Sequence, residues 1–172
     1  DSFYYYFGRF YLYRENYGKS YDYFTEFIDI TNDTNRKNEV KELLSNIKNI
    51  GVTNEDYQMA QNLIASEKEG DAIEFIDKYI KQFPNSYQGY YLKGICYKNL
   101  SQYDDAISHF EKALKYNPNS SDIYNEMGLC YLSKSIYHKA ELNFSYALKN
   151  NPEDIAVLYN LAILYYKKED KK

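Results

Sequence analysis

Residues 87–120 read YQGYYLKGICYKNLSQYDDAISHFEKALKYNPNS, and residues 121–154 read SDIYNEMGLCYLSKSIYHKAELNFSYALKNNPED. When the first segment is shifted by 34 residues onto the second, the same residue types recur in one register. The matched pairs are Tyr90 with Tyr124, Gly94 with Gly128, Cys96 with Cys130, Tyr97 with Tyr131, Tyr103 with Tyr137, Ala106 with Ala140, Phe110 with Phe144, Ala113 with Ala147 and Pro118 with Pro152. This match predicts that the chain uses one structural unit at least twice.

Each unit has the pattern of two helices. Apolar and small residues follow one another at intervals of three and four, with a polar turn in between, which is typical of two amphipathic helices. Pro118 and Pro152 end the units, because proline cannot continue a helix. Small residues such as Gly94 would let the two helices approach to roughly 8 to 10 Å, and the large Phe110 would fill the remaining volume.

The register extends in both directions from these two units. Backward it reaches Ala60 and Ile76, which predicts a degenerate unit over 53–86 with Tyr79 in place of a small alanine. Forward it predicts a terminal or capping helix with a charged tail over 155–172. One helix pair cannot bury both of its faces, so the stacked units are expected to share a continuous core.

The N-terminal third fits the register less regularly. Residues 1–34 carry Gly8 and Phe24 at the expected offsets, which predicts a divergent unit. Residues 35–52 exceed the period, and their apolar residues lie at helical spacing. They predict one extra amphipathic helix that ends at Gly51.

The repeating pattern resembles the tetratricopeptide repeat, with an aromatic residue, glycine and tyrosine on the first helix, then alanine, phenylalanine and alanine on the second, then proline. The resemblance covers residues 53 to about 166. It implies an all-α fold, a right-handed α-α superhelix or helical-repeat solenoid of about ten helices. It also implies a concave face lined by the first helix of each pair.

Composition narrows the classes of partner. The formal net charge of −4 and the sequence pI of about 5.3 leave no excess of positive charge that would attract nucleic acid or anionic lipid. The longest apolar stretch, residues 3–13, contains Arg9 and is much shorter than the roughly 20 residues of a membrane-spanning helix. Two cysteines do not form a disulfide framework, which favours a reducing compartment such as the cytoplasm.

No residue pattern indicates catalysis, a metal or a cofactor. Cys96 and Cys130 occupy equivalent positions on different helices, too far apart for a disulfide, and are expected to fill small buried sites. No CxxC motif is present, and no histidine lies beside either cysteine in sequence. His109 and His138 are expected on solvated helix faces. We therefore expect a protein that is not an enzyme.

The first helices supply the candidate binding residues. Positions three before and one after the small residue of each first helix should face the concave side, with neighbouring turns adding three more. The predicted groove residues are Tyr57, Gln61, Tyr91, Lys98, Asn99, Asn125, Leu129, Tyr159 and Asn160, with Ile95 and Ile163 alongside. Tyrosines and amides of this kind can anchor an extended or helical peptide. Because the chain has 23 tyrosines, the stripe could equally reflect composition.

The leading interpretation is a protein-interaction module that binds a peptide or helix of a partner protein in this groove. Some tetratricopeptide domains hold the acidic C-terminus of a chaperone with cationic and amide side chains. The matching positions here are Tyr57, Gln61, Leu92, Asp122 and Glu126, whose two carboxylates would repel such a ligand. The alternative interpretation is a structural domain that packs on other domains or on copies of itself through its N-terminal or C-terminal helices.

Overall fold

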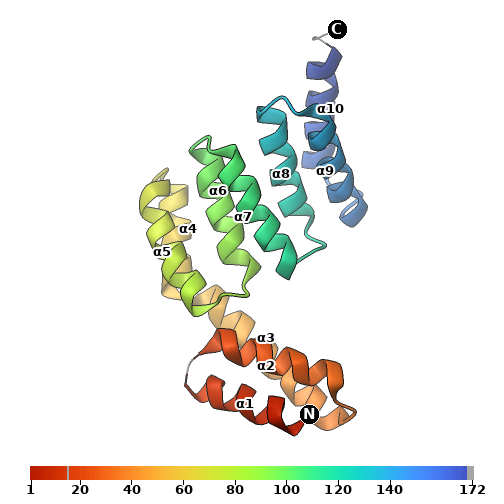
Figure 1. Ribbon diagram of the computed structural model, residues 1–172. Helices are drawn as coiled ribbons and strands as arrows, with labels where there is room; N and C mark the ends of the chain where they lie inside the picture. Colours follow the sequence, from red (N-terminus) through yellow and green to blue (C-terminus); the bar gives the residue numbers. More distant parts are fainter. Residues whose placement is uncertain (15, 170–172) are drawn as a thin grey trace.

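The computed structural model describes residues 1–14 and 16–169, which form ten α-helices and no strand (Figure 1). The helices are α1 (Ser2–Tyr13), α2 (Tyr17–Ile30), α3 (Thr34–Thr53), α4 (Glu55–Ala65), α5 (Glu69–Gln82), α6 (Tyr87–Asn99), α7 (Tyr103–Tyr116), α8 (Ser121–Ser133), α9 (Tyr137–Asn150) and α10 (Ile155–Glu169). The expected all-α class with about ten helices is confirmed.

Helices α4 to α9 form three antiparallel pairs that stack side by side, and α10 packs against the last pair (Figure 1). Within the pairs α6/α7 and α8/α9, a glycine lies directly under a phenylalanine ring. A Cβ atom added at Gly94 would lie 2.4 Å from Cε1 of Phe110, and one at Gly128 would lie 2.4 Å from Cε1 of Phe144. The repeated glycine therefore marks a helix contact that has no room for a side chain.

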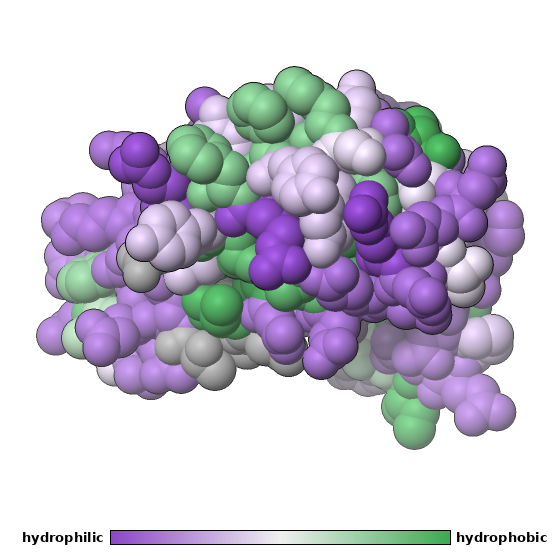
Figure 2. All heavy atoms as spheres, turned by 90° about the horizontal axis from the view of Figure 1, so that it is seen from below, coloured by the Kyte–Doolittle hydropathy of each residue, from purple (hydrophilic) through white to green (hydrophobic). Residues whose placement is uncertain are grey.

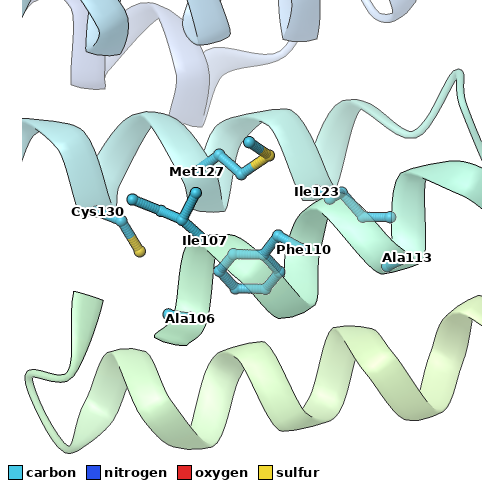
Figure 3. Packing of buried hydrophobic residues seen from close by; sticks show 7 residues of the cluster. All are labelled: Ala106, Ile107, Phe110, Ala113, Ile123, Met127 and Cys130. Carbon is cyan, nitrogen blue, oxygen red and sulfur yellow. The ribbon is translucent and has the colours of Figure 1, made fainter. Parts of the chain in front are cut away.

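The second helix of each pair also packs against the next pair. Phe110 of α7 is fully buried in one cluster with Ile123, Met127 and Cys130 of α8 (Figure 3). Figure 3 shows these α7 and α8 side chains pointing toward one another between the two helices. The core is thus continuous from pair to pair, as stacked repeats require.

The turns within the pairs share one backbone conformation. Glu67, Ser101 and Ser135, each 34 residues from the next, are the only non-glycine residues with positive φ in the described part of the chain, at 57°, 61° and 59°. After α6, the N–H of Gln102 donates to the carbonyl of Tyr97, and the N–H of Ser101 donates to the carbonyl of Lys98. This Schellman motif satisfies the last carbonyls of each first helix.

A left-handed residue with a side chain costs roughly 1 to 2 kcal/mol, so we expect Ser101→Gly to raise the free energy of unfolding by up to about 1 kcal/mol. Chemical denaturation measures the change. Ser108→Gly is the matched control, because Ser108 is exposed inside α7, where glycine should destabilise by roughly 0.5 to 1 kcal/mol. Equal losses of stability in both variants would contradict the assigned turn geometry.

The first two helices repeat the pair geometry. A Cβ atom added at Gly8 of α1 would lie 2.4 Å from Phe24 of α2, the same close approach as in the later pairs. The hydroxyl of Ser20 donates to the carbonyl of Gly8 at 2.9 Å and ties the helices together. This contact supports our interpretation of residues 1–34 as a divergent repeat, which stays a prediction.

Helix α3 is the extra helix expected between the first pair and the rest. It buries Val40 and Ile47 against Phe24 and Phe27 of α2. It does not end at Gly51 as the sequence suggested, since the helix continues to Thr53. A glycine costs a helix interior only about 1 kcal/mol, so the helix can continue through this position.

The N-terminal helices α1 to α3 lie across the end of the stacked pairs (Figure 1). Tyr17 of α2 stacks on Phe83 with ring centroids 5.2 Å apart, and a Cβ atom on Gly18 would lie 2.5 Å from Pro84. Asp22 of α2 accepts a hydrogen bond from Asn85. The beginning of α2 is therefore packed on the turn between α5 and α6.

Among the described residues, none of the helices combines the length and the apolar character needed to cross a membrane.

Candidate partner-binding groove

The inner face of the stack is formed by the first helices of successive pairs. Helix α6 contacts α4 on one side and α8 on the other, and α10 contacts α8. When the helices along one edge of a stack lie close together, that edge becomes concave. Figure 1 shows the four helices following one another along the array. These contacts place α4, α6, α8 and α10 along one edge of the stack, the edge that the resemblance to the tetratricopeptide repeat implies is concave.

Two polar contacts join neighbouring first helices across this face. Lys98 Nζ of α6 lies 2.6 Å from Glu126 Oε2 of α8, and both side chains are mostly buried. Asn160 of α10 donates from Nδ2 to Oδ1 of Asn125 at 2.9 Å. Three of the predicted groove residues, Lys98, Asn125 and Asn160, therefore form lateral contacts in the inner face.

Tyr57 and Tyr91 contribute to the core as well as to the inner face. The Tyr57 ring lies 5.1 Å from that of Tyr79, and the Tyr91 ring lies 5.9 Å from that of Phe110. Burial raises the pKa of the Tyr91 hydroxyl, and the carboxylate of Glu126 raises it further. Two of the three predicted groove tyrosines therefore have a structural role in addition to any binding role.

The remaining predicted residues differ in exposure. Tyr159 is 67% exposed and Gln61 is exposed, whereas Leu129 is partly buried against the cluster formed by α8, α9 and α10. Asn99 donates to Oε1 of Glu69 at 2.9 Å. Because Glu69 lies at the start of α5, the second helix of the preceding pair, this contact directs the Asn99 amide away from the first helices.

The two cysteines are free and completely buried, as expected. Cys96 packs in a cluster with Ala60, Ala72 and Ile76. Burial raises the pKa of both thiols to about 12, so neither is a thiolate at neutral pH. Within the described residues, no group of three or more His, Cys, Asp or Glu side chains could hold a metal ion.

The histidines differ from each other. His138 is exposed as predicted, but the prediction of a solvated face is wrong for His109. Its ring stacks on Tyr97 with centroids 5.2 Å apart, and its Nδ1 is buried without a hydrogen-bond partner. Burial, with help from Lys93 and Lys112, lowers its pKa to about 4. His109 is therefore neutral near pH 7 and acts as a packing residue.

A cavity of about 140 Å³, which no sequence pattern indicates, lies at the junction of the N-terminal helices with the pairs. Its walls come from α2, α3, the α5–α6 turn and the end of α7. The lining residues include Tyr17, Ile47, Phe83, Tyr87 and Tyr116. Segments so far apart in sequence are brought together only by the insertion of α3, which the period does not place.

Comparisons with known proteins agree with the repeat pattern. A family model described as Tetratricopeptide repeat matches residues 87–120, and a second with the same description matches residues 109–141. No curated protein sequence matches the chain significantly.

Among solved structures, the crystal structure of MamA protein is similar over 98% of this chain and 82% of its own, with 17% identity and a TM-score of 0.62. The type III secretion translocator chaperone SycD of Yersinia enterocolitica is similar over 69% of this chain and 95% of its own, with 21% identity and a TM-score of 0.64. The first TPR of Spaghetti (RPAP3) bound to HSP90 peptide SRMEEVD covers 71% and 95%, with 14% identity and a TM-score of 0.65. At these identities, the likeness concerns the fold.

The close glycine–phenylalanine contacts, the repeated αL turns and the family matches over residues 87–141 coincide in the same helix pairs. Residues 87–141 therefore match the tetratricopeptide repeat, and the solved structures similar to the chain share its helical-repeat fold.

Proposed function

We propose that this protein is a non-enzymatic interaction module that binds a peptide or helix of a partner protein along the concave face. The observation that carries the proposal is the row of side chains on successive first helices, with Asn125 and Asn160 linked and the neighbouring Tyr159 exposed. The helices are already formed, so binding requires little ordering of the receptor. An exposed tyrosine beside amide groups is a favourable anchor for a peptide.

The charges of the inner face argue against a strongly acidic ligand. Burial raises the pKa of the Tyr91 hydroxyl, and the carboxylates of Glu126 and Asp122 raise it further. The ammonium group of Lys98 is already paired with Glu126. The Spaghetti domain in the comparison holds the acidic peptide SRMEEVD, which would meet repulsion from Asp122 here. We therefore propose a neutral or basic partner segment for this groove.

The test uses Asn125→Ala combined with Tyr159→Ala. A pull-down identifies a partner, and titration with the identified segment measures its dissociation constant. We expect the double variant to weaken binding at least about tenfold, because it removes an exposed aromatic anchor and an amide. Tyr91 is unsuitable for this test, since its contact with Phe110 would mix binding with stability.

Leu142→Ala serves as the matched control, because Leu142 is 52% exposed on α9, a second helix. The control should bind as the wild type does. If both variants bind with the wild-type dissociation constant, the concave face is not the binding site.

A second candidate function is self-association through α1. This helix buries Tyr5 and Gly8 against α2 and α3 but leaves an aromatic face exposed. The exposed residues are Phe3, Tyr6, Phe7, Phe10 and Tyr13. Figure 2, seen from the lower end of Figure 1, shows hydrophobic side chains gathered together on this end of the molecule. Clustered apolar surface of this kind often marks an interface.

Sedimentation velocity over a roughly hundredfold concentration range tests this second candidate. We expect the average mass of the wild type to rise with concentration and that of Phe3→Glu/Phe10→Glu to remain monomeric. Leu142→Glu adds a charge at an exposed apolar site on α9 and should behave as the wild type. A wild type that stays monomeric over the whole range would exclude this function.

A further inference from the structure

The cavity at the junction of the N-terminal helices with the stacked pairs is walled mainly by aromatic rings. Tyr17 of α2 stacks on Phe83 with ring centroids 5.2 Å apart, and Phe83 packs against Tyr79 of α5 with centroids 5.0 Å apart. Phe83 and Tyr79 are both buried, so their rings form a fixed inner wall. Tyr21 of α2 and Tyr87 of α6 add two further rings to the lining.

The volume of the cavity fits a single aromatic ring. The volume of about 140 Å³ is close to the roughly 150 Å³ of an apolar protein cavity that holds benzene. A ring that enters this cavity buries apolar surface, and it also gains offset or edge contacts with the tyrosine rings. A ligand with one aromatic ring therefore suits both the size and the walls of the cavity.

The polar groups that remain unused in the lining favour an anionic group on that ligand. Lys48 of α3 is the one charged residue among the described lining residues, and it takes part in none of the ion pairs of the described chain. The hydroxyls of Tyr79 and Ser86 share a hydrogen bond of 2.8 Å, and Ser86 donates to Oε1 of Gln88 at 2.6 Å. This arrangement occupies the amide oxygen of Gln88 and leaves its Nε2 group as a donor. A lysine and an amide N–H together favour a carboxylate.

Another amide of the lining is already used within the protein. Asn85 donates from Nδ2 to Asp22 of α2, and this hydrogen bond joins the α5–α6 turn to the N-terminal helices. Asp22 itself is not among the lining residues. None of the lining residues belongs to the predicted groove, so the cavity is a separate site between two parts of the chain.

We propose that this cavity binds a small aromatic carboxylate. The aromatic ring lies between Tyr21 and the wall formed by Tyr79 and Phe83, and the carboxylate faces Lys48 and the amide nitrogen of Gln88. Because the walls come from α2 and α3 as well as from α5 to α7, the bound molecule connects the N-terminal helices to the stacked pairs. This site goes beyond the proposed binding of a partner segment in the groove.

Phenylpropionate serves as the probe, because it carries one ring and one carboxylate on a short chain. Isothermal titration calorimetry of the full chain measures its dissociation constant. We expect saturable one-to-one binding with a dissociation constant below about 1 mM, which a ligand of this size can reach. Phenylpropanol has the same ring without the charge, and we expect it to bind at least about threefold more weakly.

Two variants with matched controls locate the site. Lys48→Gln removes the cation, and Tyr21→Ala removes a ring that is 36% exposed, so both variants should fold, which circular dichroism checks. We expect each to raise the dissociation constant of phenylpropionate at least about threefold. The controls are Lys41→Gln, at an exposed position of α3, and Tyr166→Ala, at a residue of α10 that is 73% exposed. Neither control residue lines the cavity, so both controls should bind as the wild type does.

The proposal is overturned if phenylpropionate does not saturate the wild type at millimolar concentration, or if either Lys48→Gln or Tyr21→Ala binds it as tightly as the wild type. An acetylated tripeptide that ends in phenylalanine carries the same ring and carboxylate on a peptide chain. We expect this peptide to bind more weakly than phenylpropionate, because the cavity has room for little more than the ring. Tighter binding of the peptide would instead make the C-terminus of a partner protein the ligand.

Discussion

Phe110→Ala is expected to lower the free energy of unfolding by about 3 to 5 kcal/mol, the usual cost of truncating a buried phenylalanine. The ring is fully buried between Gly94 of its own pair and the α8 residues Ile123 and Met127 (Figure 3). Removal of the ring opens a cavity where the pairs α6/α7 and α8/α9 meet, so both pairs lose packing contacts. Urea denaturation followed by circular dichroism measures the change.

Leu142→Ala provides the control for this truncation, since Leu142 is 52% exposed and should change stability by less than about 0.5 kcal/mol. A loss below about 1 kcal/mol for Phe110→Ala would contradict the placement of this ring in the shared core.

The glycine–phenylalanine contact can be exchanged for the alanine–isoleucine contact found in α4/α5. Gly94→Ala alone should destabilise by roughly 1 to 3 kcal/mol, because its Cβ would lie 2.4 Å from the Phe110 ring. Phe110→Ile alone should cost a similar roughly 1 to 3 kcal/mol through the volume it removes. In the double variant the new methyl group occupies part of that volume. We expect an interaction energy of about 1 to 2 kcal/mol in favour of the pair.

Thermal and urea denaturation of the four proteins completes this double-mutant cycle. Strictly additive losses would show that the two positions do not touch, which would contradict the register that equates Ala60 and Ile76 with Gly94 and Phe110.

The 34-residue period predicts the helix pairs because the residues that repeat in the sequence make the same packing contact in each pair. Gly94 and Phe110 carry the signal in sequence and also make the close contact in space. The same spacing predicts the degenerate pair, although Tyr79 there is buried, packs its ring against that of Tyr57 and shares a hydrogen bond of 2.8 Å with Ser86. The spacing of residue types is sufficient to predict a contact wherever the residues that repeat in the sequence also touch one another in the fold.

The period does not predict contacts between residues that do not repeat from one pair to the next. Asn99 turns to Glu69, and His109 stacks on Tyr97, because each side chain meets the helix that happens to lie beside it. The contact of Tyr17 with Phe83 depends on how α3 bridges the two parts of the chain. Such contacts follow from the three-dimensional packing and leave no period in the sequence.

Hydrogen–deuterium exchange of the chain with and without its bound partner segment tests the proposed groove most directly. We predict added protection in the first helices α6, α8 and α10, especially around Asn125 and Asn160, with little change in the second helices α7 and α9 (Figure 1). Protection confined to α1, or to the second helices, would contradict binding in the concave face.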